Sequence, residues 1–392
     1  MKAGWEVRPL GDAATFVMGQ APAGSDCNRE GIGTPFVKAG EFGERRPIIR
    51  EWTTDPKKFA KETDVLICVV GATCGKINLG ADCAIGRSAA AIRPKAERLD
   101  QFYLHYYLEG QVQKFRAGSV GAAQTVISRD MLSEMPIPLP PLKEQQQIVA
   151  VLDEAFEGLT RAHAHAEANL QNARELFDEV VNACFAKANA LDGDATTLGA
   201  LAEFRNGLNY TRTSTGRSVK IVGVGDFKDH FNVPLDTLSA ITIDGELAAN
   251  DQLRAGDIIA VRSNGNRELI GRTMLVPSLA EQVSFSGFTI RIRLITDKLL
   301  PEYLCEYMRT KKARRTLIDG GGGSNISNLN QGLLSSLPIR FPDLAAQRDT
   351  LHELDLARTQ SIELVRQYET KLQSLDALRQ SLLQRAFSGE LT

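Results

Sequence analysis

The chain has 392 residues, 43% hydrophobic and 24% charged, a composition that indicates two or three globular domains and argues against wholesale disorder. The longest strongly apolar run, residues 65–70, is far shorter than the about 20 residues of a membrane-spanning helix, and the N-terminus shows no secretory signal. The net charge of −2 does not by itself indicate nucleic acid, and the six cysteines, which form no C-x-x-C pair, predict neither a zinc site nor a disulfide framework. We therefore expect a reduced, cytoplasmic protein with no membrane partner.

The first predicted block covers residues 1–142 and mixes strands with a helix. The pattern of apolar and turn residues predicts strands at 36–42, 65–70 and 89–92 and a helix at 100–116. Asp100 is a plausible N-cap for that helix. A proline-broken stretch at 136–141 ends the block.

A long periodic segment, residues 143–190, follows the prolines. Apolar residues recur there at a mean step of 3.6 from Ile148 to Cys184, through Leu176, and no proline interrupts them. This period predicts a single long helix. Because such a helix has no domain of its own to bury its apolar stripe, we expect it to pack against another long helix.

The second predicted block, residues 191–340, follows the same plan. Its strands are expected at 221–224, 257–261 and 289–294, and its helix at 299–319. A second long periodic segment, residues 341–392, closes the chain. The overall prediction is an α/β (α+β) protein with two blocks and two long helices.

The chain is an internal repeat. Tyr103 and Tyr107 recur 200 residues later, and Gln145, Leu176 and Phe185 recur 202 residues later as Gln347, Leu378 and Phe387. A shift of 202 held over about fifty residues indicates duplication, and the smaller shifts nearer the start of each half indicate insertions. The long segments are acidic, with 4 basic against 10 acidic residues over 143–199 and 6 against 8 over 341–392, whereas the blocks are mildly basic.

Motifs for catalysis are not convincing in this sequence. Residues 71–76 resemble a phosphate-binding loop but have one residue too few between the glycines, and Ile77 stands where the Mg²⁺-binding hydroxyl belongs. Residues 222–225 offer only two glycines of a dinucleotide fingerprint. His163 and His165 point to different faces of a helix, and an Asn-Pro-Pro-aromatic tetrapeptide is missing. We therefore expect no catalytic residues and no metal site.

Two kinds of polar, glycine-containing loop are candidate DNA contacts. The strand-end loops (70–76 and 262–267) and the post-helix loops (118–128 and 320–328) combine glycines, which allow close backbone approach, with side chains that bond phosphates or base edges. Plain polar turns and flexible linkers are the alternatives for these loops. Basic clusters, including Lys311-Lys312 and Arg314-Arg315, give weaker support, because such runs are often solvated faces. The candidate DNA-binding residues are Arg45, Arg46, Thr73, Lys76, Gln124, Thr125, Ser128, Asn209, Tyr210, Arg212, Arg262, Ser263, Asn264, Asn266, Arg267, Ser324 and Asn325.

The whole layout resembles one family, the specificity subunits of type I restriction–modification systems. The resemblance rests on Pro-Leu-Pro-Pro-Leu-x-Glu-Gln at 138–145, on Gly-Trp-Glu-Val at 4–7, on the closing Ala-Phe-Ser-Gly-Glu-Leu-Thr at 386–392, and on the duplication. The second helix opening, at 341–347, departs from the pattern because it lacks the Pro-Pro pair and the glutamate.

The resemblance implies a division of labour along the chain. Residues 1–142 and 191–340 would be target recognition domains, each reading one half of a split, asymmetric double-stranded DNA site. Residues 143–190 and 341–392 would be spacer helices that pair antiparallel and dock two modification (methyltransferase) subunits, through which restriction (translocase and nuclease) subunits join. S-adenosylmethionine and ATP with Mg²⁺ would belong to these partners, and this chain would carry no cofactor. A coiled-coil scaffold without DNA specificity and a self-sufficient DNA methyltransferase or nuclease are the alternatives.

Overall fold

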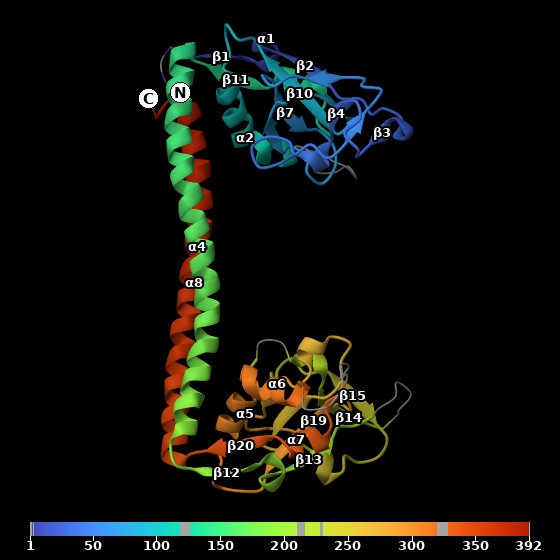
Figure 1. Ribbon diagram of the computed structural model, residues 1–392, viewed down its shortest axis with the longest axis vertical. Helices are drawn as coiled ribbons and strands as arrows, with labels where there is room; N and C mark the ends of the chain where they lie inside the picture. Colours follow the sequence, from blue (N-terminus) through green and yellow to red (C-terminus); the bar gives the residue numbers. More distant parts are fainter. Residues whose placement is uncertain are drawn as a thin grey trace. The chain divides into compact units, whose positions relative to one another are not determined.

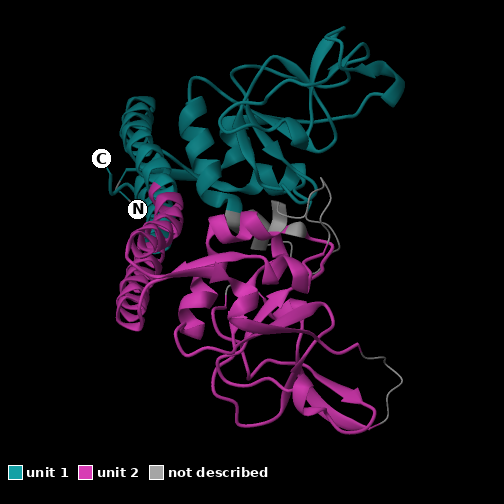
Figure 2. Cartoon of the chain, turned by 60° about the horizontal axis from the view of Figure 1, so that its bottom comes forward, with its two compact units in different colours: residues 1–168, 368–392 teal, residues 169–367 magenta. Residues whose placement is uncertain are grey.

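The computed structural model describes residues 2, 4–117, 126–209, 216–227, 230–319 and 328–391. It divides into two compact units, coloured separately in Figure 2: unit 1 contains Met1–Ala168 and Tyr368–Thr392, and unit 2 contains Asn169–Gln367. Each unit therefore holds one block together with part of each long helix. Within the described ranges, no helix has the length and apolar character needed to cross a bilayer.

Unit 1 is built around an antiparallel four-stranded sheet of order β2-β10-β7-β8 (Figure 1). Alternate residues of β7 enter two different cores: Val65 and Ile67 pack with α2, whereas Leu66 and Cys68 pack with β4 and β9. Because both faces of the central strands are covered, these strands are apolar throughout rather than alternating. The elements of this block are β1 (Glu6–Pro9), α1 (Leu10–Ala13), β2 (Ala14–Met18), β3 (Cys27–Asn28), β4 (Thr34–Val37), β5 (Trp52–Thr53), β6 (Phe59–Ala60), β7 (Val65–Cys68), β8 (Ile77–Leu79), β9 (Cys83–Ile85), β10 (Ala89–Pro94), α2 (Gln101–Ala117), α3 (Arg129–Glu134) and β11 (Pro136–Leu139).

Unit 2 repeats this plan. Its four-stranded sheet has the order β13-β19-β16-β17, and a two-stranded pair, β12 with β20, corresponds to β1 with β11 in unit 1. A further sheet of order β15-β14-β18 covers the other face. The elements are β12 (Asp194–Thr197), β13 (Ala202–Asn206), β14 (Arg217–Val222), β15 (Ala240–Ile243), β16 (Ile258–Val261), the 3₁₀ turn η6 (Arg267–Leu269), β17 (Thr273–Leu275), β18 (Val283–Phe285), β19 (Thr289–Leu294), α5 (Pro301–Arg309), α6 (Lys311–Asp319), α7 (Gln331–Ser335) and β20 (Pro338–Phe341).

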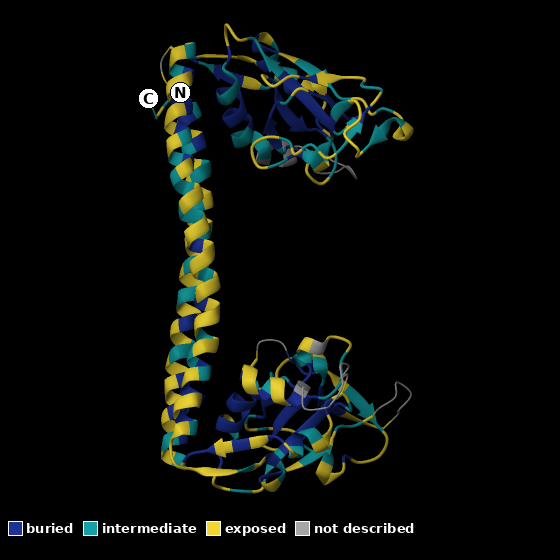
Figure 3. Ribbon diagram, viewed as in Figure 1, coloured by how far each residue is buried: buried dark blue, intermediate teal, exposed yellow. Residues whose placement is uncertain are grey.

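The two long helices, α4 (Leu142–Ala190) and α8 (Leu344–Ser388), pair antiparallel inside each unit. In unit 2, Ala173 of α4 accepts a hydrogen bond from Ser361 of α8 at 3.0 Å. Farther along α4, Lys187 pairs with Glu353 at 2.8 Å, so residue numbers rise on one helix as they fall on the other. The predicted α+β fold with paired long helices is therefore confirmed, and Figure 3 shows both helices as mostly exposed or intermediate, with scattered buried positions.

Each block receives the end of a long helix through the same aromatic cluster. In unit 1, Phe387 of α8 packs edge-on against Tyr103 and Tyr107 of α2, with ring centroids 5.1 Å apart in both pairs. In unit 2, Phe185 of α4 packs against the equivalent tyrosines of α5 at 5.1 and 5.7 Å. These are the repeated aromatic residues of the sequence, so the duplication is a repeat in three dimensions as well.

Three local predictions are wrong. The helix expected at 299–319 is two helices, because the backbone of Thr310 is extended and ends α5. The hydroxyl of Thr310 then accepts a hydrogen bond from the amide of Ala313 and so caps the start of α6. The strand expected at 36–42 ends at Val37, where a 3₁₀ turn begins at Ala39. Leu176 and Leu378, placed on the helix seam, are instead 50% and 47% exposed.

Candidate nucleic-acid interface

In unit 1 the described end of the post-helix loop, residues 126–128, meets the strand-end loop. Val70 forms an isolated antiparallel bridge with Val126, and the amide of Ile127 donates to the carbonyl of Val69 at 2.9 Å. The two loops are separate candidates in the sequence. The fold holds them together at the end of the central strand β7.

In unit 2 the one described residue of the post-helix loop, Asn328, meets the strand-end loop in the same way. Ser263 bridges Asn328, and the amide of Leu329 donates to the carbonyl of Arg262 at 2.8 Å. The two junctions therefore lie at the same place in each unit and differ in sequence. This is the arrangement that two different half-sites require.

The strand-end loop of unit 1 is shaped by its glycines. Gly71 and Gly75 have φ angles of +94° and +86°, a region that side chains disfavour. The hydroxyl of Thr73 lies 3.3 Å from the sulfur of Cys68, and Lys76 Nζ donates to the carbonyl of Phe42 at 2.7 Å. The loop is therefore a compact, preformed turn, and one donor of Lys76 is already engaged.

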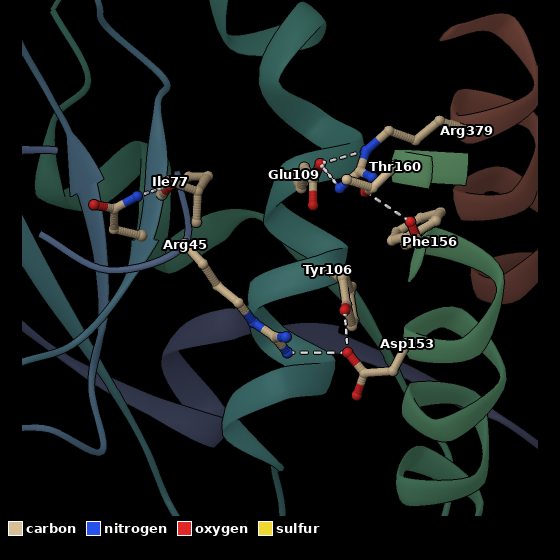
Figure 4. Close-up of polar contacts among 9 residues, drawn as sticks. Arg45, Ile77, Tyr106, Glu109, Asp153, Phe156, Thr160 and Arg379 are labelled. Atoms are coloured by element: carbon tan, nitrogen blue, oxygen red, sulfur yellow. Dashed lines mark hydrogen bonds and ion pairs between the residues drawn. The ribbon is translucent and has the colours of Figure 1, made fainter. Parts of the chain in front are cut away.

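The remaining candidates of unit 1 also make internal contacts. Arg45 donates to Asp153 of α4 at 3.0 Å, and Arg46 donates to the carbonyl of Gly80 at 2.6 Å (Figure 4 for Arg45). The hydroxyl of Ser128 caps α3 by accepting from Met131 at 3.1 Å. These contacts position the side chains, and their assignment to DNA stays a prediction.

In unit 2 the polar side chains of the strand-end loop build the turn itself. Asn264 accepts from the amide of Asn266, and Asn266 accepts from the amide of Glu268, at 2.7 and 3.0 Å. Arg262 Nε is buried and has no hydrogen-bond partner within the described ranges. Asn209 is exposed beside the bridge between Leu208 and Ser286.

Other candidates lie outside the described residues, so the structure gives them no position, and for Arg267 only the backbone is described. The residues outside the described ranges are Gln124, Thr125, Tyr210, Arg212, Ser324 and Asn325.

A cavity of about 860 Å³ lies in unit 1 where α2 faces the long helices. Figure 4 shows its polar contacts: Tyr106 donates to Asp153 at 2.5 Å, and Arg379 of α8 donates to Glu109 at 2.7 Å. Burial, and then the positive charges of Arg45 and Arg379, lower the pKa of His105 to about 4. The carboxylates here join α2 to both long helices.

Two buried glutamines were not considered as candidates, although they support the site. Gln145 accepts from the amide of Asp100 at 2.8 Å and donates to two carbonyls, and Gln347 does the same in unit 2 with the amide of Leu300 at 2.9 Å. Each fixes the start of a long helix to its block. The repeat at a shift of 202 is the signal that could have revealed them.

Comparison with known proteins gives consistent matches. Residues 2–171 match the family described as type I restriction modification DNA specificity domain. The chain is 23% identical to the StySPI specificity subunit of Salmonella potsdam and 22% identical to the EcoKI specificity subunit of Escherichia coli K12, each over 99% of this chain and 89% of the relative. A third relative, the putative MjaX specificity subunit of Methanocaldococcus jannaschii, is 34% identical over 44% of this chain and 41% of its own length.

Solved structures support the same fold. A chain from a structure described as the basis of complex assembly and conformational transition of the type I R-M system aligns with a TM-score of 0.76 at 17% identity, covering 100% of this chain and 99% of that chain. The HsdS subunit of Thermoanaerobacter tengcongensis aligns with a TM-score of 0.64 at 18% identity, covering 100% and 98%. At these identities the likeness establishes the fold alone.

Proposed function

Because this chain belongs to the specificity subunits of type I restriction–modification systems, we propose that it reads a bipartite, asymmetric double-stranded DNA target, one half with each unit. Its role is DNA sequence recognition, without a catalytic step of its own. The observation that carries the bipartite reading is the pair of loop junctions, Val70 with Val126 and Ser263 with Asn328, which share one frame and differ in sequence. The scaffold and self-sufficient-enzyme alternatives gain no support from the relatives.

We assign the target recognition domains to residues 1–142 and 191–340, and the spacer helices to 143–190 and 341–392. Two readers on one spacer face half-sites at a fixed separation, which is about one turn of DNA, roughly 34 Å, if both approach the same face. In each strand-end loop, backbone amides approach the phosphates closely while Thr73, Arg262 and neighbouring polar groups supply donors. The complex acts in the cytoplasm, where the DNA is.

Sequencing of methylated bases in cells with and without the gene tests this proposal. The expected result is a methylated sequence that depends on the gene and consists of two unlike specified halves around an unread gap of several base pairs. A continuous palindrome, or methylation that does not change when the gene is removed, contradicts it.

We further propose that two modification subunits dock on the long helices, and that restriction subunits join through them. S-adenosylmethionine and ATP with Mg²⁺ are placed on these partners. The support is a repeated pair of exposed leucines, Leu176 in unit 2 and Leu378 in unit 1, which are 50% and 47% exposed and related by the shift of 202 residues. Two equivalent apolar positions on acidic helices fit two copies of one partner protein better than they fit DNA.

Leu176→Asp and Leu378→Asp test the docking sites. Each single variant should bind one modification subunit instead of two, and the double variant should bind none, because a carboxylate in an apolar contact is desolvated without a partner. The mass of the assembled complex measures this. Leu356→Asp is the matched control, since Leu356 is also 50% exposed on α8 but has no leucine at the repeated position. Two bound subunits in both single variants contradict the proposal.

A further inference from the structure

A cavity of about 560 Å³ in unit 2 lies between the last third of α4, the turn η6 and the junction of α5 with α6. Five cationic side chains and two carboxylates line it: Arg272, Arg309, Lys311, Arg314, Arg315, Asp178 and Glu268. We propose that this cavity is a phosphate-binding site that holds the backbone of the DNA, an inference that rests on the proposed function.

Lys311 pairs with Asp178 at 3.2 Å, whereas Arg309 and Arg314 are positioned by neutral carbonyl oxygens. Arg314 donates to the carbonyl of Glu268 at 2.6 Å, and Arg309 donates to the carbonyl of His230 at 3.1 Å. Carbonyl oxygens fix the orientation of a guanidinium group but leave its positive charge in place, so the cavity retains an attraction for anions.

Arg314 is in an unfavourable environment in this arrangement. Its Nε atom is buried with no hydrogen-bond partner among the residues that the structure describes. Burial, and then the charge of Arg272, lower the pKa of Arg314. A phosphate in the cavity would give the buried donor an acceptor and offset the repulsion between the two arginines.

The position of the cavity favours DNA over an acidic protein segment. Glu268, whose carbonyl holds Arg314, lies in η6, and η6 follows directly from the strand-end loop through the bond between Asn266 and the Glu268 amide. A phosphate backbone that passes the strand-end loop therefore reaches the cavity, and the forked geometry of arginine suits phosphate.

The corresponding cavity of unit 1 has a different charge. The shift of 200 residues that relates Tyr107 to Tyr307 also relates Glu109 to Arg309, and the cavity of unit 1 has five carboxylates against four cationic side chains. Its arginines are paired, Arg45 with Asp153 and Arg379 with Glu109. The phosphate site is therefore specific to unit 2.

Salt dependence of DNA binding tests the proposal on the full chain assembled with its modification subunits. The variants are Arg315→Ala, which changes only an exposed side chain, and Arg314→Gln combined with Arg315→Ala. Each arginine that no longer neutralises a phosphate should make the slope of log K against log salt less steep by about 0.9. The slope should therefore become less steep by about 0.9 in Arg315→Ala and by about 1.8 in the double variant. The weakening should be equal on a random-sequence duplex and on one that contains the methylated target, because phosphates carry no sequence information.

Arg161→Ala is the matched control, since Arg161 is an exposed arginine lining the cavity of unit 1, and it should leave the slope unchanged. Unchanged slopes in a folded double variant, checked by thermal unfolding, overturn the proposal. So does a double variant that keeps its slope but no longer binds modification subunits, because the cavity would then bind an acidic segment of that protein. If the wild-type complex binds neither duplex, the proposed function itself fails, which distinguishes the two outcomes.

Discussion

In unit 1, Asp64 accepts two hydrogen bonds from the guanidinium group of Arg93, both at 2.8 Å; in unit 2, Asp257 accepts two from Arg293, both at 2.7 Å. Each aspartate directly precedes the central strand, and each arginine is the last residue but one of the neighbouring strand, so the same strand register makes both pairs. Buried polar contacts of this kind have been kept in both copies. These contacts fix the arrangement of the central strands, so the loops that follow the strands can differ in sequence without changing it.

The contacts between the two long helices have the same chemistry in each unit but do not use repeated residues. Arg379 of α8 lies over Phe156 of α4 in unit 1, with 3.9 Å from its guanidinium carbon to the ring centroid. In unit 2, Arg358 of α8 lies over Phe177 of α4 at 5.2 Å. The shift of 202 residues relates Phe156 to Arg358 and Phe177 to Arg379, so α4 supplies the ring and α8 the cation in both places. Helices α4 and α8 are therefore complementary at these contacts, although the repeat makes their sequences similar.

The largest expected effect comes from breaking the shared frame. Asp64→Asn removes a fully buried charge and leaves Arg93 without its partner, which should destabilise unit 1 by about 3 kcal/mol or more. Asp257→Asn should do the same to unit 2. The chain has two tryptophans, Trp5 and Trp52, and both lie in unit 1, so tryptophan fluorescence during denaturant unfolding follows unit 1 and circular dichroism follows both units.

The expected outcome is selective: Asp64→Asn shifts the fluorescence transition, and Asp257→Asn shifts only the dichroism. Lys298→Ala serves as the control, because its pair with Asp194 is mostly exposed and should contribute about 1 kcal/mol or less. Equal shifts of the fluorescence transition in both aspartate variants would show that the two units do not unfold independently.

The fold follows from signals that repeat along the sequence. The 3.6-residue period from Ile148 to Cys184 and the shift of 202 residues are enough to predict the long helices and their pairing. The break at Thr310 has no such signal, because threonine is common within helices and acts as a cap only when its backbone is extended. For the same reason the exposure of Leu176 could not be predicted, since one periodic apolar position looks like another.

The candidate site was predictable only in part. The loops are recognisable from their glycines and amides, but the bridge between Val70 and Val126 joins residues far apart in sequence and depends on the sheet being formed. The contacts of Arg45 and Lys76 within unit 1 likewise require the fold. Whether the proposed residues bind DNA stays a prediction that the salt-dependence and methylation experiments test.

A smaller difference between the units, with almost no effect at neutral pH, is predicted at His105. Unit 2 carries Cys305 at the equivalent position, and both side chains are buried. Because the pKa of His105 is lowered to about 4 in the folded chain, against 6.5 for an ordinary histidine, the unfolded chain takes up a proton first as the pH falls. Unit 1 should therefore lose stability between about pH 6.5 and pH 4, by at most about 1.4 kcal/mol per pH unit, and this contribution is absent above that window.

His105→Cys, which installs the residue of unit 2, should remove this contribution while leaving the stability at neutral pH nearly unchanged. Tryptophan fluorescence measures unfolding of unit 1 at several pH values, and the difference between wild type and variant cancels the titration of the carboxylates that both share. His165→Cys is the control for the loss of a histidine in the same unit, because His165 is an exposed residue of α4. If the stability of unit 1 depends on pH in the same way in wild type and in His105→Cys, the buried histidine does not cause the predicted loss of stability in acid.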